Sequence, residues 1–261
     1  MKIASLLLTS AFVAVAFGAS AAQPQGAQAI PHSRNGNVEM ILIPAGEFAM
    51  GSSRGMESPQ RKVYLDAYMI GKYDVTVGQF KAYCAAKRIS FSQFAPPTWG
   101  WIDSHPMVNV SWQEARNYCK WAGGDLPTEA QWEKAARGTD GREFPWGQAF
   151  DPSRLWRSTA HEADALSTIP VGKFPSGASP YGCLDIVGNV WQWCLDWSGP
   201  NYSGQPDRNP TGPDTGEYRV LRGGSWNWNK PDLFRCAFHH GDDPIIHISD
   251  VGFRLASRPS L

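Results

Sequence analysis

The second half of the chain is cut into short pieces by turns that contain glycine and proline. After Arg137 the segments FPWG, FPSG, SPYG and NPTGP interrupt the sequence, and only short apolar runs lie between them. Proline fixes φ and lacks a backbone donor, while glycine adopts turn conformations freely, so long helices and strands do not cross such segments. Because the 261 residues include 26 Gly, 20 Pro and 12 Trp, we expect a loop-rich domain with an aromatic core.

Three helix starts precede this region. Thr76, Ser111 and Thr128 are each followed three residues later by Gln or Glu, which is the pattern of a capping box. Glu129 and Glu133 of the third helix are expected to be cap or solvent-exposed residues. Behind the first two caps, small and apolar residues recur at helical spacing: Val77, Phe80 and Cys84, then Trp112, Ala115, Cys119 and Ala122.

Short apolar runs also predict strands. Met40–Pro44 has the composition of a buried strand, and the segment VYLDAYMIGKYDVT offers two more. The chain shows no internal repeat and no obvious boundary. We therefore predict one α+β domain over residues 37–258.

The first residues have the features of a secretory signal peptide. Lys2 precedes the apolar stretch Ile3–Phe17, and a small-residue cleavage site follows at 19–21. The apolar stretch is short for a membrane span, although an uncleaved anchor is the alternative. We predict a signal peptide over 1–21, a linker over 22–36, and a mature protein that is periplasmic or secreted without stable membrane insertion.

The charges of the chain balance. Lys and Arg together number 24, as do Asp and Glu, so the formal net charge is zero. This balance argues against nucleic acid as the partner. We expect a monomer.

Five cysteines lie after the predicted signal peptide, and none has CxxC spacing, so a zinc-knuckle or thiol-redox motif is not indicated. Cys84 and Cys119 both fall on core-facing helical stripes. They could form a disulfide after export, or remain as two buried free thiols.

A series of longer segments carries a family resemblance. In chain order they are HPMVNVSWQEARNYCKWAGGDLPTEAQWEKAARG, FPWG, YGCLDIVGNVWQWCLDW, YRVLRGGSW, FRCA and DVGFRLA. The series resembles the formylglycine-generating-enzyme family, which includes sulfatase-modifying factors, iron-dependent sulfoxide synthases and periplasmic pyoverdine-maturation proteins. The resemblance implies an irregular α+β fold related to C-type lectins, with little regular secondary structure.

The resemblance also indicates which chemistry is missing. In formylglycine-generating enzymes two cysteines after the GGS motif bind copper, and soft thiolates are the ligands that Cu(I) requires. The corresponding positions here are Trp228 and Leu233. Cys236 matches a structural family cysteine whose usual partner position is Ala136, so the resemblance suggests a bond between Cys194 and Cys236 instead.

The segment after GGS is the candidate site. Trp228 is proposed as a catalytic residue, with Ser225, Trp226 and Asp232 lining a groove that holds a peptide or planar ligand. The alternative is that the tryptophans pack internally, which we favour for Trp226. Asp250 is expected to be a turn residue near the chain end.

A histidine-rich segment, HHGDDPIIH, follows. His239 and His240 complete the candidate catalytic set, and with His247 and the carboxylates of Asp242 and Asp243 they offer the ligand types of a non-heme iron site. The alternative is that His239 takes over the hydrogen bonds of an arginine that relatives carry there, while the rest is a solvated loop. Iron or copper is thus a candidate cofactor without the usual cysteine ligands.

The resemblance further implies one calcium site beside the VGN motif. Its ligands here would be the Asp185 side chain, the carbonyls of Gly188 and Val190, and the Gln192 side chain. Oxygen donors of this kind suit Ca²⁺.

Three functions follow as hypotheses. The first is an oxidoreductase of the pyoverdine-maturation type that finishes an exported peptide or siderophore-like natural product. The second is a non-catalytic, lectin-like binding module. The third is a true sulfatase-activating formylglycine generator, which Trp228 and Leu233 disfavour.

Overall fold

The computed structural model describes residues 29–32, 35–158, 167–199, 202 and 204–259. The predicted signal peptide, 1–21, lies outside this part of the chain. Within the predicted linker, by contrast, residues 29–32 form a strand that pairs with the next one, so regular structure begins before residue 37. None of the helices in the described ranges is apolar and long enough to cross a bilayer.

Each predicted cap starts a helix. The three α-helices are α1 (Val77–Lys87), α2 (Trp112–Ala122) and α3 (Glu129–Arg137). Both hydrogen bonds of the capping box form at all three; at α1, the Thr76 hydroxyl accepts from the Gln79 N–H and the Gln79 side chain accepts from the Thr76 N–H. Within the described residues, five single-turn 3-10 helices lie between the longer elements: η1 (Gly55–Glu57), η2 (Phe91–Gln93), η3 (Pro152–Arg154), η4 (Pro175–Gly177) and η5 (Pro231–Phe234).

The strands form three small sheets. The first has the antiparallel order β1 (Ala29–His32), β2 (Val38–Ile43), β5 (Tyr68–Gly71), β10 (Ala256–Ser257). The second is the hairpin of β3 (Gly46–Met50) and β4 (Arg61–Leu65). The third has the order β8 (His239–Asp242), β7 (Arg219–Arg222), β6 (Trp191–Trp197), β9 (Val251–Gly252), in which only β6 and β9 run parallel. The three strands expected near residues 40–76 are therefore confirmed as β2, β4 and β5.

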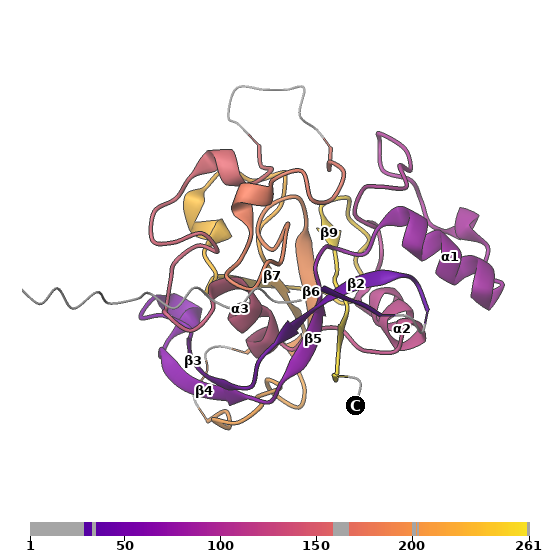
Figure 1. Ribbon diagram of the computed structural model, residues 1–261. Coiled ribbons are helices and arrows are strands. Elements are labelled where there is room, and N and C mark those ends of the chain that lie inside the picture. Colours follow the sequence, from indigo (N-terminus) through magenta and orange to yellow (C-terminus); the bar gives the residue numbers. More distant parts are fainter. Residues whose placement is uncertain (1–28, 33–34, 159–166, 200–201, 203, 260–261) are drawn as a thin grey trace, which may run out of the picture.

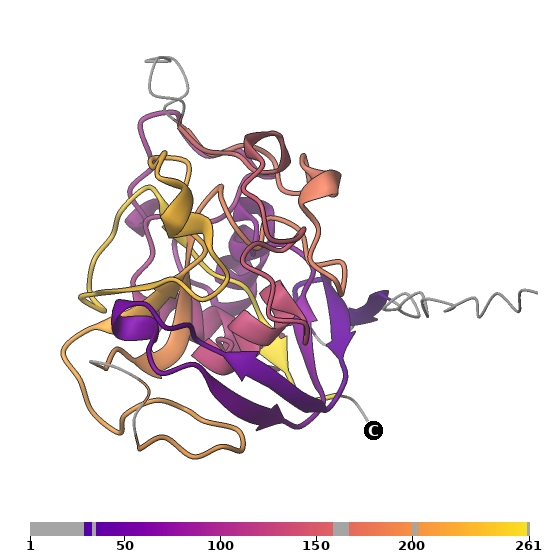
Figure 2. The ribbon, with the colours of Figure 1, turned by 90° about the vertical axis from the view of Figure 1, so that its left-hand side faces the viewer.

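The helices and sheets enclose an aromatic core. Phe80 of α1 stacks on Tyr118 of α2 with ring centroids 5.7 Å apart, and both contact Phe253 edge-on. Trp132 of α3 and Trp193 of β6 are fully buried. Among the described residues between α3 and β7, β6 and two single-turn 3-10 helices are the regular elements and loops make up the rest (Figures 1 and 2), as the Gly and Pro segments after Arg137 predict.

The cysteines are all buried and free. The disulfides suggested for Cys84 with Cys119 and for Cys194 with Cys236 are therefore absent, and the alternative of buried free thiols is correct. Packing directs the thiols toward backbone: the Cys119 sulfur lies 3.9 Å from the carbonyl oxygen of Arg254. Burial raises the pKa values of Cys119 and Cys194 well above the usual thiol range, which keeps them protonated and unreactive.

Glu129 and Glu133 are not solvent-exposed, contrary to expectation. Both are buried on the inner side of α3, where the Arg222 guanidinium of β7 binds Glu129 at 2.7 Å and Glu133 at 2.9 Å. The sequence of the helix suggested exposure because it contains no obvious partner for the two carboxylates, and a carboxylate without a partner is expected to face water. The partner comes from a strand about ninety residues further along, and it joins α3 to the third sheet.

Candidate functional site

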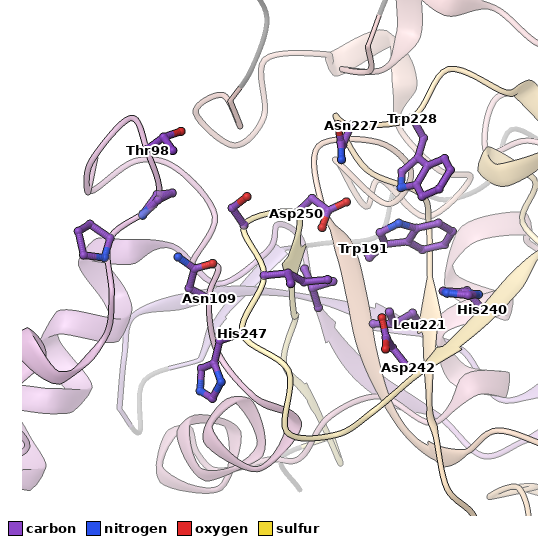
Figure 3. A pocket seen from close by; sticks show the side chains of 15 residues that line it. Thr98, Asn109, Trp191, Leu221, Asn227, Trp228, His240, Asp242, His247 and Asp250 are labelled. Atoms are coloured by element: carbon purple, nitrogen blue, oxygen red, sulfur yellow. The ribbon is translucent and has the colours of Figure 1, made fainter.

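A cavity of about 630 Å³ lies where segments from distant parts of the chain meet, and Asn109 and Leu221 of β7 contribute to its lining. Its walls come from residues 96–98, the start of β6, the loop after the GGS motif, and residues 240–251 (Figure 3). The lining residues are Pro96, Pro97, Thr98, Asn109, Trp191, Leu221, Asn227, Trp228, His240, Asp242, His247, Ile248, Ser249, Asp250 and Val251.

Two indoles form one side of the cavity. Trp191 is buried at the start of β6, whereas Trp228 remains 44% exposed and forms the outer part of the same wall. The His240 ring lies beside Trp191, with ring centroids 6.0 Å apart (Figure 3). Flat aromatic faces of this kind hold planar or apolar groups and leave the polar atoms to set orientation.

Asp250 supplies the buried carboxyl group of the cavity. The Ser225 hydroxyl donates to it at 2.8 Å. Burial raises the pKa of Asp250 from its usual range, and the negative charge of Asp242 adds to the rise, although hydrogen bonds from Ser225 and Trp228 oppose it. A carboxyl group in such surroundings can exchange a proton with a bound ligand. Asp250 lies in a turn, as expected, and it also lines the cavity.

Ser225 and Trp226 lie behind the wall and do not line the cavity. The indole N–H of Trp226 donates to the carbonyl of Ser249 at 3.3 Å, and its ring packs edge-on against Trp99. Internal packing, which we favoured for Trp226, is therefore confirmed. Ser225 is fully buried and acts on the cavity only through Asp250.

His239 and His240 point to opposite faces of β8. His240 is exposed and lines the cavity, whereas His239 is buried and hydrogen-bonds Glu129 through Nδ1. Successive residues of a strand alternate between faces, so one member of the pair must face the core. His239 is consequently part of the buried network around Arg222 and cannot contact a ligand in the cavity.

Of the other residues in the histidine-rich segment, some line the cavity and others do not. His247 lines the far side of the cavity and binds Glu114 at 2.8 Å, while Asp243 is not among the lining residues. Across the described residues, no group of three His, Cys, Asp or Glu side chains is placed to hold a metal ion. The arrangement therefore does not fit the iron site considered from the sequence.

Asp232, expected to line the groove, lies elsewhere. It is an exposed residue of η5 whose carboxylate pairs with Arg54 and Arg235, each at 3.4 Å. Asp232 is not among the residues that line the cavity and belongs to a surface ion-pair cluster.

The residues of the implied calcium site are near one another, but three of the four implied ligands already accept hydrogen bonds. The Gln192 side-chain oxygen accepts from the Trp132 indole and from the Arg254 guanidinium, both at 2.6 Å. The amide N–H of the same side chain donates to the Asp185 carbonyl at 2.9 Å. The Arg254 guanidinium thus supplies the positive charge that a calcium ion would otherwise bring to the Gln192 oxygen.

Of the three remaining ligand positions, Asp185 and Gly188 are engaged in the same way. The Asp185 carboxylate accepts from the Gly172 N–H at 2.6 Å, and the Gly188 carbonyl accepts from the Val190 N–H at 2.8 Å. A Ca²⁺ ion needs six to eight free oxygen ligands. As arranged, this donor set does not fit calcium.

No cysteine is among the described residues that line the cavity. Trp228, at one position that the resemblance assigns to a copper ligand, is instead part of its wall. Leu233, at the other, packs against the hydrophobic core.

This architecture and the motifs around its cavity define a class of protein. The chain belongs to the family of sulfatase-modifying factor enzyme 1-like domains, and the model of that family matches residues 26–259. It is similar to the formylglycine-generating enzyme of Streptomyces coelicolor, with 34% identity over 95% of this chain and 97% of that protein.

Two further comparisons bear on length and fold. The chain is 37% identical to the serine/threonine-protein kinase pkn1 of Chlamydia pneumoniae, over 84% of this chain but only 38% of that protein. The structure of PvdO from Pseudomonas aeruginosa superposes with a TM-score of 0.78 at 24% identity, covering 90% of this chain and all of that one. The latter similarity establishes the shared fold, including its single-domain, irregular α+β character.

Proposed function

We propose that this protein is an exported maturation factor of the formylglycine-generating-enzyme family that acts on a peptide or peptide-like natural product without copper-thiolate chemistry. The observation that carries the proposal is the cavity itself. It combines a buried carboxyl group, Asp250, with the imidazole of His240 and two indole walls, and it has a tryptophan at a copper-ligand position.

The proposed roles follow from burial and exposure. Asp250 holds or releases a proton, since its raised pKa brings it closer to the working pH than an ordinary carboxyl group. His240 is the second proton-exchanging group, and Trp191 and Trp228 hold the apolar part of the substrate. The reaction class is the one that the resemblance to pyoverdine-maturation proteins implies, and the similarity to PvdO supports the shared fold.

A binding module is the second candidate. The exposure of Trp228 favours it, because an open indole wall can hold a ligand without any reaction. A module of this kind needs the aromatic wall but not the proton-exchanging carboxyl group. The two candidates therefore differ in how much they depend on Asp250.

A deletion and complementation experiment separates them. The gene is deleted in its host, exported peptides are compared by mass spectrometry, and the strain is complemented with wild type, Asp250→Asn, Trp228→Ala or Asp232→Asn. Asp232 is the matched control because it is an exposed aspartate outside the cavity. The proposal expects an immature product to accumulate with Asp250→Asn and Trp228→Ala but not with Asp232→Asn. Full complementation by Asp250→Asn with failure of Trp228→Ala would support the binding module.

An in vitro assay tests the missing copper chemistry. The purified protein is incubated with Cu(I), oxygen and a sulfatase peptide that contains the substrate cysteine, and the Streptomyces enzyme serves as the positive control. We expect no formylglycine. Conversion at a rate comparable to the control would refute the proposal.

A further inference from the structure

A second cavity of about 450 Å³ adjoins the first. His247 lines both, so the two are separated by little more than this side chain and the loop that carries it. The lining residues of the second cavity are Ser111, Trp112, Gln113, Trp197, Arg219, Pro244, Ile245 and His247.

Arg219 is the central polar group of this second cavity. Its guanidinium lies between two indoles, 3.8 Å from the ring centroid of Trp112 and 3.5 Å from that of Trp197. One nitrogen, Nη1, donates to the Leu195 carbonyl at 2.6 Å, whereas the buried Nε has no hydrogen-bond partner among the described residues. The group is therefore held rigidly and is not neutralised by an ion pair in this part of the chain.

The neighbouring charges leave Arg219 available to an anion. The Glu114 carboxylate is engaged by His247 and by the Ser111 N–H and hydroxyl. Asp196 is buried, and this burial together with the charge of Glu129 raises its pKa to about 8, so it remains largely protonated at neutral pH. Arg116 adds positive charge beside Trp112, although it is paired with Asp125 at 2.9 Å.

Two exposed apolar side chains flank His247 between the cavities. Ile245 is 72% exposed and Ile248 is 39% exposed, and they lie on the loop that separates the two cavities. Trp228 extends the same apolar surface on the far side of the first cavity. Exposed apolar side chains that border two cavities mark a site for a ligand with an apolar body.

We propose that the second cavity is a carboxylate-binding subsite, in which Arg219 holds the carboxylate of a ligand whose apolar body crosses Ile245 and Ile248 into the first cavity. The inference rests on the proposed function and deepens it, because it assigns the substrate to peptide-like molecules that carry a free carboxylate. A guanidinium fixed between two aromatic rings binds a carboxylate with little loss of side-chain entropy.

Binding of two small probes tests this subsite. Isothermal titration calorimetry compares N-acetylphenylalaninate with N-acetylphenylalaninamide, which has the same apolar body but no charge. Wild type is expected to bind the carboxylate at least about tenfold more tightly than the amide. Equal affinities for the two probes would overturn the proposal.

Three variants test whether Arg219 is responsible for the preference for the carboxylate probe. Arg219→Met is expected to abolish the preference, and Arg219→Lys to restore part of it. Arg208→Met is the matched control, because Arg208 also stacks on an aromatic ring, that of Tyr64 at 4.4 Å, but lies outside both cavities. An unchanged preference in Arg219→Met, or an equal loss in Arg208→Met, would contradict the assignment.

Two more variants keep the test decisive. If Arg219→Met does not fold, Ile245→Asp places a negative charge at an exposed position beside the cavity, and it should weaken the carboxylate probe but not the amide. Full maturation by the Asp250→Asn strain, together with an intact carboxylate preference in wild type, would refute only the proposed function. Intact maturation without any carboxylate preference would refute only the subsite.

Discussion

His239 and His240 are neighbours in the chain but lie on opposite faces of β8. His239 is buried against Glu129 in the network that Arg222 organises, whereas His240 faces the cavity beside Trp191. The pair therefore divides into a structural residue and a candidate functional one. This division leads to the first prediction.

His239→Ala should destabilise the fold, while His240→Ala should not. The first change removes a hydrogen-bond partner of a fully buried carboxylate, which costs about 1–3 kcal/mol; the second affects an exposed side chain and should change stability by less than about 0.5 kcal/mol. Urea denaturation with constant m-values measures both. Equal losses in the two variants would show that the residues do not differ in role.

The Gln192–Arg254 pair predicts the response to chelators. Because both the nitrogen and the oxygen of the Gln192 amide are used in hydrogen bonds, treatment with EGTA should leave the melting temperature unchanged. Gln192→Ala should instead lower stability by about 1–3 kcal/mol, since it leaves the Trp132 and Arg254 donors unpaired in the core. A clear fall in melting temperature on chelation, with calcium detected by elemental analysis, would restore the calcium hypothesis.

Asp196 should make stability fall with rising pH. Burial and the charge of Glu129 raise its pKa to about 8, from the 3.8 that is usual for an aspartate side chain. Between these values the native state keeps a proton that the unfolded state has lost, so the free energy of unfolding decreases as pH rises through this window. Asp196→Asn can still accept the Glu129 N–H bond and should flatten the decline between pH 5 and 8 by at least about 1 kcal/mol.

The control for this measurement is Asp232→Asn, which alters an exposed carboxylate. It should reproduce the pH dependence of wild type. A parallel pH profile in Asp196→Asn and wild type would mean that Asp196 is ionised in the folded protein.

Gly224 should tolerate no side chain. Its φ is +72°, and a Cβ atom would lie 2.5 Å from the Phe234 ring. Gly224→Ala should therefore cost more than about 1 kcal/mol and should displace the loop that carries Trp228. Gly100→Ala has a similar φ of +77° but an open neighbourhood, so the difference between the two melting temperatures isolates the clash. Equal shifts would show that only backbone conformation matters.

Much of the framework follows from local sequence. Thr76, Ser111 and Thr128 start helices because both partners of a capping box lie within four residues, and the outcome needs no distant contact. The Gly and Pro segments after Arg137 exclude long elements for equally local reasons. The family motifs, read in order, were sufficient to identify the fold.

The site, in contrast, depended on contacts between distant segments. Glu129 is 110 residues from His239, and Arg254 is 62 residues from Gln192, so neither the buried face of β8 nor the orientation of the Gln192 amide is visible in local patterns. For Asp250 the sequence indicated only a turn. It could not show the hydrogen bond to the Asp250 carboxyl group, because the donor, Ser225, lies in a different loop. The sequence by itself determined the helices, the loops and the family; tertiary structure decided which side chains face the cavity, because burial and hydrogen-bond partners are properties of the assembled fold.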